Sequence, residues 1–311
     1  ILVKMSIRRK ILPFLFNISP KLSVQVKFLT LYPHYRKFLS FKNPISLDEK
    51  IQWLKFNTYN NNSLVTLCAD KYRVREYLSH LGLEEILNEL YGAYDQPEEI
   101  DWEKLPQKFV IKWNFGQGHN FFCADKTTLQ IPETMQLLKD WRKTHSRFHK
   151  QYSELHYRDI QPKLICEKYI ETEDGALPVD YKVYCFNGVA HFVLVCTNRA
   201  SGKPSFYFVD KDWELQRLNK SGKEAPEGFQ VPKPEGYQQL FEYASRLAKP
   251  FPFVRVDLYL EKGKVIFGEL TFTPAGGFDP NRLYDTDLLF GSMVDLDYGK
   301  NCRSLEDVEK T

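Results

Sequence analysis

The sequence predicts an α+β protein built from antiparallel hairpins and amphipathic helices, and three stretches carry this prediction. Residues 253–272 alternate apolar and polar side chains on both sides of a Lys-Gly-Lys turn, which is typical of two paired strands. Asn187-Gly188, between two apolar runs, predicts a second tight hairpin. Residues 237–249 carry apolar side chains at helical spacing, which indicates a helix with one buried face.

Composition limits the class of protein. The chain has 311 residues, enough for two ordinary domains or one large one. With 43 % hydrophobic and 27 % charged residues it can bury a core, and its net charge of +3 gives no case for nucleic-acid binding. No apolar run approaches the roughly 20 residues of a membrane span. The six cysteines form no CxxC motif and no cluster with histidine, so we expect buried reduced thiols, as in a cytoplasmic protein.

Residues 1–40 mix basic and apolar side chains, with a basic run at 8–10 that leads directly into an apolar one. We expect an ordinary helix on the body of the domain, or a linker to a preceding domain. The alternative is a short interfacial helix that makes peripheral contact with the inner face of a membrane. The first residue is Ile, so we expect the chain to be part of a longer multidomain protein, or to start at Met5.

Two helix starts follow. Ser46 and Glu49 form a capping box before a helix that extends to Phe56. Asp70 can cap another helix, whose first turn carries Lys71. A cation in a first turn opposes the helix dipole, so Lys71 either meets an anionic ligand there or lies on a solvated helix face.

A strand that ends in a lysine and runs into a glycine loop is the next signal. Lys112 closes the apolar run 108–112, and Gly116 and Gly118 follow it. A lysine beside a loop whose glycines allow close approach of the main chain can meet a phosphate group. The glycine spacing matches neither a Walker motif nor GxGxxG, so a plain hairpin turn is the alternative.

The middle of the chain offers weaker signals. Residues 126–150 read as one helix, in which we expect His145 and His149 to be solvated. Residues 162–170 read as a strand that leads into an acidic turn, and residues 200–236 as an irregular crossing segment rich in Gly, Pro and Lys.

The hairpin at 253–272 has the strongest chemical signal. A three-residue turn at 262–264 would place Asp257 opposite Glu269, with Cβ atoms roughly 5 Å apart. Two carboxylates at that distance repel each other unless a cation lies between them, and hard oxygen ligands suit Mg²⁺. Arg255 lies on the same face and could hold an anion beside the metal. The alternative is a surface ladder in which Arg255 pairs with one carboxylate.

In combination, these motifs resemble the ATP-grasp superfamily, and more closely the TupA-like ATP-grasp proteins of bacterial surface-polysaccharide loci. The resemblance covers residues 41–280 and rests on FKNPISLDEKIQWLKF, ADKYRVREYL, KFVIKWNFGQGHN, ICEKYIE, DYKVYCFNG and RVDLYL…FGELTFTPAGG. It implies an ATP-grasp fold, in which two α+β subdomains close on ATP and Mg²⁺. The expected units are an N-terminal helical region at 1–66, a small lid subdomain at 67–166 and a large subdomain with the metal-binding hairpin at 167–311.

The resemblance also implies roles for single residues. The implied contacts to the ATP phosphates are Lys71, Lys112, Lys182 and the loop residues Gly116, Gln117, Gly118 and His119. The implied contacts to adenine and ribose are Glu167, Lys168, Ile170 and Asp174, with Glu171 or Glu173 as alternatives to Asp174. The implied Mg²⁺ ligands are Asp257, Glu269 and Thr271. Many relatives have Asn where Thr271 stands, which leaves a second metal site open. Arg255 and Lys182 are the implied catalytic residues.

The implied activity is that of an ADP-forming carboxylate–amine ligase, in which a carboxylate becomes an acyl phosphate that an amine attacks. The implied substrates are a small amine and a uronic acid of a capsular or cell-wall polysaccharide or its precursor. The alternatives are a phosphotransferase acting on a hydroxyl of a glycan precursor, and a non-catalytic nucleotide-binding module. Such chemistry needs positioning and charge neutralisation, and the sequence contains no visible Ser-His-Asp or Cys-His constellation.

Overall fold

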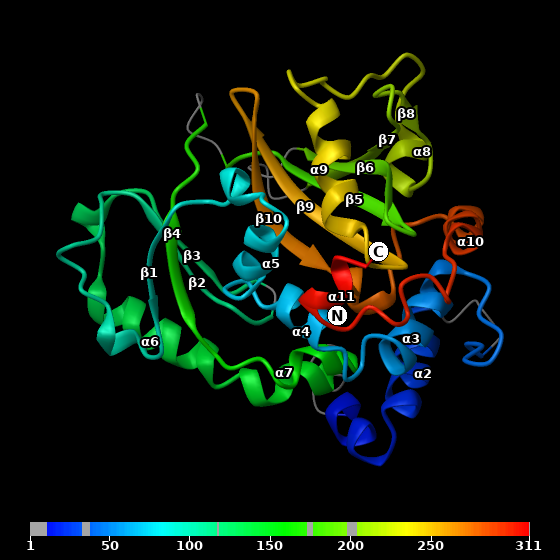
Figure 1. The fold of residues 1–311 in the computed structure, drawn as a ribbon, viewed down its shortest axis with the longest axis horizontal. Coiled ribbons are helices and arrows are strands. Elements are labelled where there is room, and N and C mark those ends of the chain that lie inside the picture. Colours follow the sequence, from blue (N-terminus) through cyan, green and yellow to red (C-terminus); the bar gives the residue numbers. More distant parts are fainter. Residues whose placement is uncertain (1–10, 33–37, 117, 173–176, 198–203, 311) are drawn as a thin grey trace.

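The computed structural model describes residues 11–32, 38–116, 118–172, 177–197 and 204–310. These residues fold into two antiparallel sheets with helices packed against them, which confirms the predicted α+β class (Figure 1). No helix within these ranges is long and apolar enough to cross a membrane. All six cysteines are buried free thiols, as predicted.

A four-stranded sheet lies on the left of Figure 1, in the order β1-β4-β2-β3. Its strands are β1 (Leu90–Tyr94), β2 (Phe109–Trp113), β3 (Asn120–Cys123) and β4 (Leu164–Lys168). Every second residue of β2 is buried, and the indole of Trp113 donates a hydrogen bond of 3.0 Å to the main-chain oxygen of Leu138 in α6 (Ile131–Arg142). α6 therefore covers one face of this sheet, while Val110 and Lys112 point to the other.

A six-stranded sheet forms the rest of the body, in the order β10-β9-β5-β6-β7-β8. Its strands are β5 (Asp180–Phe186), β6 (Val189–Thr197), β7 (Ser205–Val209), β8 (Leu215–Gln216), β9 (Phe253–Glu261) and β10 (Lys264–Thr271). α9 (Gln238–Ala248) packs over β5, β6 and β9, against the face that carries Val254, Val256 and Leu258 (Figure 1). Because side chains alternate along a strand, the polar residues of β9 lie on the opposite face.

The turn between β9 and β10 is one residue shorter than predicted. It consists of Lys262 and Gly263, both with positive φ, which is the geometry of a two-residue hairpin turn. A bulge at Gly268 then adds one residue to β10 and pairs Asp257 with Glu269. The predicted turn is wrong and the predicted pair is confirmed, because the two shifts of one residue cancel.

The remaining α-helices of the body are α3 (Leu47–Asn57), α4 (Ser63–Ala69), α5 (Val74–His80), α7 (His145–Tyr152), α8 (Lys220–Glu224), α10 (Tyr284–Met293) and α11 (Leu305–Val308). The segment before the small sheet is tied to the large one, since the hydroxyls of Tyr59 and Tyr77 donate to the main-chain oxygens of Phe253 and Leu247 at 2.6 and 3.0 Å. The division of the chain after residues 66 and 166 stays a prediction.

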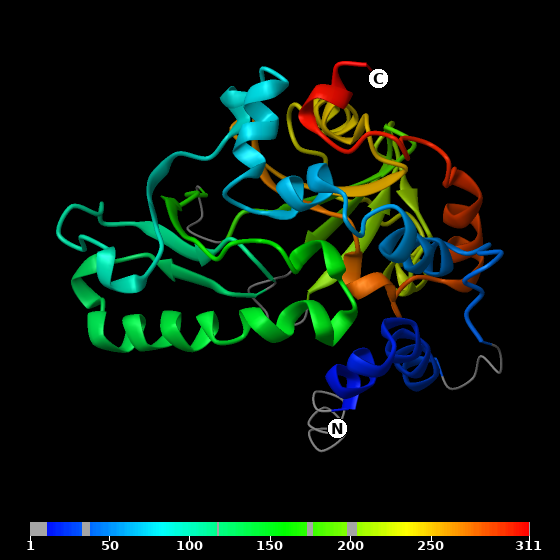
Figure 2. The same cartoon turned by 60° about the horizontal axis from the view of Figure 1, so that its bottom comes forward.

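Two helical segments precede α3, residues 11–18 and α2 (Pro20–Leu31), and they project from the body at the bottom of Figure 2. Val24 and Phe28 of α2 pack with Phe278 in a small cluster that is separate from the main core. Further contacts with the body are made by the ring of Phe16 against that of His149 and by the hydroxyl of Ser153, which donates to the main-chain oxygen of Pro20 at 3.3 Å.

Two expectations for the middle of the chain are wrong. Residues 126–150 contain two helices, α6 and α7, and His145 and His149 are half-buried against neighbouring rings, not solvated. In residues 200–236, the described part includes β7, β8 and α8. β7 pairs with β6, which would otherwise present an open edge to solvent.

Candidate functional site

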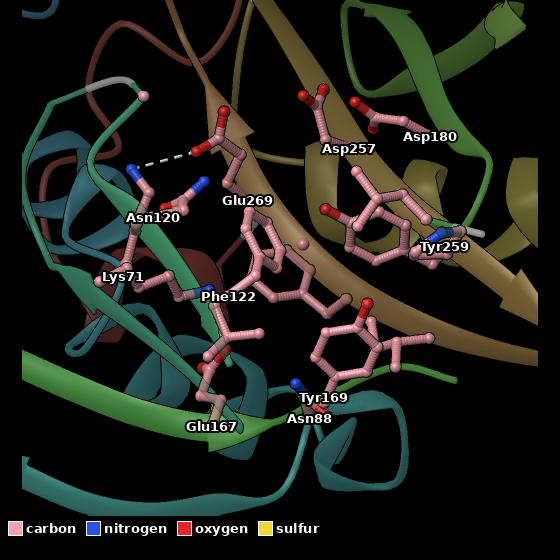
Figure 3. Close-up of a pocket in the computed structure, with 18 of the residues that line it drawn as sticks. Lys71, Asn88, Asn120, Phe122, Glu167, Tyr169, Asp180, Asp257, Tyr259 and Glu269 are labelled. Carbon is pink, nitrogen blue, oxygen red and sulfur yellow. Dashed lines mark ion pairs between the residues drawn. The ribbon is translucent and has the colours of Figure 1, made fainter. Parts of the chain in front are cut away.

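A cavity of about 320 Å³ opens between the two sheets. Its lining includes residues of β2, β3 and β4 on one side and of β5, β9 and β10 on the other. Figure 3 shows the carboxylates of Asp180, Asp257 and Glu269 close together at one side, with the rings of Phe122, Tyr169 and Tyr259 below them. Among the described residues that line the cavity there is no Ser, Thr, Cys or His.

The sheet side of the cavity carries a network of opposite charges. Arg255 binds Asp257 through two hydrogen bonds of 2.6 Å, from Nε and Nη2. Lys182 lies beside Asp257 on the neighbouring strand and donates to it at 2.9 Å, and it also pairs with Asp180. Lys71 reaches Glu269 across the cavity at 3.1 Å (Figure 3). Three cations thus neutralise three carboxylates on a surface with little contact with water.

These charges shift the protonation of their neighbours. Burial would raise the pKa of Glu269, but the charges of Lys71, Arg255 and Lys182 outweigh it and lower that pKa to about 2. Burial would lower the pKa of Lys182, but Asp257 and Asp180 outweigh it and raise that pKa. Glu269 is therefore an anion and Lys182 a cation at neutral pH, as a site for phosphate and metal requires.

Lys71 is held in place by the residues around it. Asp70 accepts hydrogen bonds from the main-chain N–H groups of residues 72 and 73, and from the amide of Asn114 at 2.8 Å. The main-chain N–H of Lys71 donates to the oxygen of Asn114 at 3.0 Å, which joins this turn to the end of β2. Its ammonium, on a side chain only 11 % exposed, donates to the main-chain oxygen of Gly116 at 2.8 Å. Lys71 thus lies in the turn between α4 and α5, so both its expected place in a first helical turn and the alternative of a solvated helix face are wrong.

The opposite wall carries a second ion pair and an apolar slot. Lys112 binds Glu167 at 2.8 Å, and Arg75 approaches the same carboxylate at 3.8 Å. Both main-chain polar groups of Lys168 are engaged, since its N–H donates to the main-chain oxygen of Glu89 and its oxygen accepts from the amide of Asn88, each at 2.9 Å. Beyond it the lining is apolar and aromatic, formed by Val110, Phe122, Tyr169, Ile170, Leu177 and Phe267. A planar base can lie against such rings and aliphatic side chains.

The loop after β2 was expected to contact the ATP phosphates, and only part of it lines the cavity. Gly116 and Gly118 line the cavity and have φ of 76° and 73°, a conformation that favours glycine. The ring of His119 instead stacks on Trp141 at 5.3 Å, and it does not line the cavity. Gln117, and the ribose candidates Glu173 and Asp174, lie outside the described residues.

Thr271 lies behind the carboxylates. Its hydroxyl donates to Glu269 at 3.1 Å and accepts a hydrogen bond from Arg255 at 3.2 Å. Thr271 is buried and does not line the cavity. In this structure it orients Glu269, and its role as a ligand of a second metal stays a prediction.

Asp257 and Glu269 fit a divalent cation by the chemistry of their donor atoms. Both present carboxylate oxygens from paired positions on β9 and β10, and Mg²⁺ commonly takes one or two carboxylates. Within the described ranges no group of three or more His, Cys, Asp or Glu side chains could hold a metal. The remaining ligands of such an ion would therefore come from water and phosphate oxygens.

Several lining residues were not predicted from the sequence. Asp180 stands two residues before Lys182 on β5, and Tyr259 two residues after Asp257 on β9, so strand alternation could have placed both in the cavity. Asn120 and Phe122 in β3 gave no comparable signal, because the side of β3 that faces the cavity depends on how the two sheets are arranged.

Comparisons with known proteins identify the family of the chain. The model of the family described as TupA-like ATPgrasp matches residues 49–295. No curated protein matches the chain. Among solved structures, the D-alanine–D-alanine ligase of Bacillus anthracis complexed with ATP is 14 % identical, with a TM-score of 0.43, over 78 % of this chain and 64 % of that one. The chain thus spans less than two thirds of that ligase.

Two further solved structures are similar at a comparable level. The ATP-grasp ligase PsnB, complexed with a precursor variant, Mg and ADP, is 11 % identical, with a TM-score of 0.37, over 79 % of this chain and 60 % of that one. PurK, an N5-carboxyaminoimidazole ribonucleotide synthetase in an ADP complex, is 13 % identical, with a TM-score of 0.38, over 75 % of this chain and 51 % of that one.

Proposed function

The chain belongs to the TupA-like ATP-grasp family, and on that premise we propose that it is an ATP-dependent carboxylate–amine ligase. Its acceptor is a uronic acid of a bacterial capsular or cell-wall polysaccharide, or of a precursor, and its product is an amide. The observation that carries the proposal is the network of Lys71, Lys182 and Arg255 with Asp257 and Glu269 at one side of a cavity. Family membership supports the reaction class, and the glycan context rests on the sequence resemblance alone.

The lining suits a reaction that needs charge neutralisation and no protein nucleophile. Transfer of the γ-phosphoryl group to a carboxylate brings two anions together, and the cations beside them reduce that repulsion. In the proposed reaction the acceptor carboxylate attacks the γ-phosphorus directly, and the bond between that phosphorus and the leaving oxygen of ADP breaks. The acyl phosphate then reacts with the amine, a carbon–nitrogen bond forms, and phosphate leaves.

Each cation has its own place in this proposal. Lys71 and Lys112 hold the phosphates from the two sides of the cavity, and Lys182 neutralises the group in transfer. Arg255 uses Nε and Nη2 to hold Asp257, and within the described part of the chain its Nη1 has no hydrogen-bond partner. Nη1 is thus available to an anionic oxygen of the substrate or of the acyl phosphate.

Asp257 and Glu269 would hold Mg²⁺, which supplies charge stabilisation to the phosphoryl group when it is bound. We place adenine in the apolar slot beside Tyr169 and Ile170, where the hinge at 167–170 would present one main-chain donor and one main-chain acceptor to it. The assignment of Asp174 to the ribose remains part of the proposal.

One observation favours the second candidate, a phosphotransferase that acts on a hydroxyl group. Such a reaction needs a carboxylate to accept the hydroxyl proton, and Asp180 lies in the cavity, away from the hairpin. In this structure Asp180 is engaged in an ion pair with Lys182, whereas an acceptor carboxylate is already ionised and needs no base. The ligase is therefore the better-supported reading.

Release of ADP in the presence of different substrates separates the candidates. The protein is incubated with Mg²⁺ and ATP, and with uronic acids, their nucleotide sugars and a panel of amines, singly and in pairs. The ligase forms ADP together with amide only when acid and amine are both present. ADP with a neutral sugar alone identifies the phosphotransferase, and nucleotide binding without ADP identifies the non-catalytic module.

A further inference from the structure

The excess of basic over acidic residues lies at one end of the chain. Residues 1–47 contain nine Lys and Arg residues and no Asp or Glu, and the first acidic residue is Asp48. The whole chain has 43 basic and 40 acidic residues, so the rest has 34 basic against 40 acidic ones. The N-terminal segment therefore carries a charge of +9 on a body of net charge −6, an asymmetry typical of chains that bind an anionic surface.

The helices in this segment have two apolar faces, and only one of them is covered. Leu12, Val24 and Phe28 are buried, the last two against Phe278. The apolar side chains that remain exposed are Ile11, Phe14, Ile18, Leu22 and Leu29. Phe14 and Ile18 are the most exposed of these five, at 65 and 63 %. Exposed large apolar side chains that gather on one element mark an interaction surface.

The position of these helices makes this surface accessible. Residues 11–18 and α2 project from the body at the lower end of Figure 2, on the side away from the chain's C-terminus. Lys21 and Lys42 are exposed in the same region. The arrangement joins an apolar strip to basic side chains, as in helices that lie in the interface of an anionic bilayer.

We propose that residues 11–31 form a peripheral membrane anchor that binds an anionic phospholipid surface. Phe14, Ile18 and Leu22 enter the boundary between headgroups and acyl chains, while the basic residues contact lipid phosphates. A second copy of the chain is a less favourable partner for this apolar surface, because dimerisation would bring two segments of formal charge +9 together.

The anchor is attached to a border of the cavity. The ammonium of Lys27 in α2 packs beside Gly276, since a Cβ added to Gly276 would lie 2.7 Å from it. Ala275, the residue before Gly276, lines the cavity. The membrane therefore lies on this side of the catalytic cavity. The inference does not depend on which acceptor the cavity takes.

Vesicle binding by the 1–311 chain tests the proposal. The protein is sedimented with phosphatidylcholine vesicles, with or without phosphatidylglycerol, at low and high salt. We expect binding to the vesicles that contain phosphatidylglycerol, at least about tenfold weaker binding to phosphatidylcholine alone, and loss of binding as salt rises. Phe14→Ser with Ile18→Ser should reduce binding at least about tenfold at unchanged Tm, since both side chains are exposed.

The matched control is Val189→Ser with Leu289→Ser, which removes two exposed apolar side chains from β6 and α10. It should bind vesicles as the unchanged protein does. Three results would overturn the proposal: no binding at low salt, equal binding to neutral and anionic vesicles, or equal loss in both double variants. If light scattering shows a dimer that only Phe14→Ser with Ile18→Ser dissociates, and no vesicle binding, the occupant is a second copy.

Discussion

Asp257 and Glu269 face each other across the hairpin, but their surroundings differ. The side chain of Asp257 is 6 % exposed and is held by Arg255 and Lys182, whereas that of Glu269 is 32 % exposed and contacts Lys71. Phosphate groups compete with carboxylates for these same cations. Binding of a nucleotide would therefore draw the cations away and leave the two carboxylates to Mg²⁺, so metal and nucleotide should bind cooperatively.

Removing one carboxylate charge should affect turnover far more than nucleotide binding. We predict that Glu269→Gln and Asp257→Asn lower kcat by roughly 10²–10³ or more, because the charge that stabilises the transition state is lost. The Kd for ATP, measured by calorimetry with and without Mg²⁺, should change less than kcat and lose its dependence on Mg²⁺.

Glu261→Gln, at the end of the same strand, is the matched control and should keep both activity and the Mg²⁺ dependence. If both carboxylate variants keep most of their activity, the hairpin takes no part in the chemical step. Asp257→Asn should also lower stability, because it leaves Arg255 without its buried partner. Glu269→Gln is therefore the cleaner of the two tests.

His156 is a buried histidine outside the cavity, and it should make the fold sensitive to acid. Its ring lies against Tyr59 and Phe272, and within the described part of the chain neither ring nitrogen has a hydrogen-bond partner. Burial and, to a smaller extent, the charge of Lys55 lower its pKa from 6.5 to about 3. Between these two values the unfolded chain takes up a proton that the folded protein does not, so stability falls as pH falls below 6.5.

We predict that His156→Phe removes this part of the acid sensitivity. The free energy of unfolding in urea should fall less steeply from pH 6.5 to 5 than in the unchanged protein, by up to about 1.4 kcal/mol per pH unit. Parallel curves for His156→Phe and the unchanged protein would show that His156 titrates normally.

At the scale of the element, the hairpin shows how far strand alternation can be trusted. Alternation placed Arg255 and Asp257 on one face and a predicted three-residue turn placed Glu269 opposite Asp257; the shared face is confirmed, although the turn is not. The two-residue turn and the bulge at Gly268 each shift the register of β10 by one residue, in opposite directions. The same side chains face the cavity with or without both shifts, so the alternating pattern could not reveal them. The start of α3 was predictable because its capping box is a local signal that does not depend on register.

The bulge itself should be required for the site. A Cβ on Gly268 would lie 2.8 Å from the main-chain oxygen of Asp257, so Gly268→Ala must move β10 away from β9 beside the carboxylate pair. We predict a large loss of kcat and of the Mg²⁺ effect on ATP binding.

Gly263→Ala is the matched control. Its added methyl group meets no atom within 4 Å, but φ is +72°, so it should lower stability by about 1 kcal/mol or more and keep kcat. If Gly268→Ala keeps full activity, the pairing of the two carboxylates does not depend on the bulge.

At the scale of the whole molecule, the site depends on how the two sheets face each other. Lys71 comes from a turn before the small sheet, and its ammonium meets Glu269, 198 positions later in the chain. The sequence indicated which residues could bind phosphate or metal, but not these pairings across the cavity. Asp180 was missed, and His119 was placed wrongly, because neither outcome follows from local spacing.

The loop after β2 should respond to ATP as a lid. Lys71 joins the oxygen of Gly116 to Glu269, so phosphates that draw Lys71 away also act on the loop. We predict that amide hydrogen exchange at 115–120 slows when ATP and Mg²⁺ are added, while the core of β9 does not change. Equal exchange with and without nucleotide, at saturating ATP, would contradict a lid role for this loop.

Trapping of the activated carboxylate tests the central claim most directly. The protein is supplied with Mg²⁺, ATP and a uronic acid that supports ADP release, and hydroxylamine replaces the amine. We predict that a hydroxamate of that acid forms in step with ADP and phosphate, and that it is lost in Glu269→Gln. ADP formed together with a stable phosphorylated sugar, and no hydroxamate, would contradict the ligase and establish the phosphotransferase in its place.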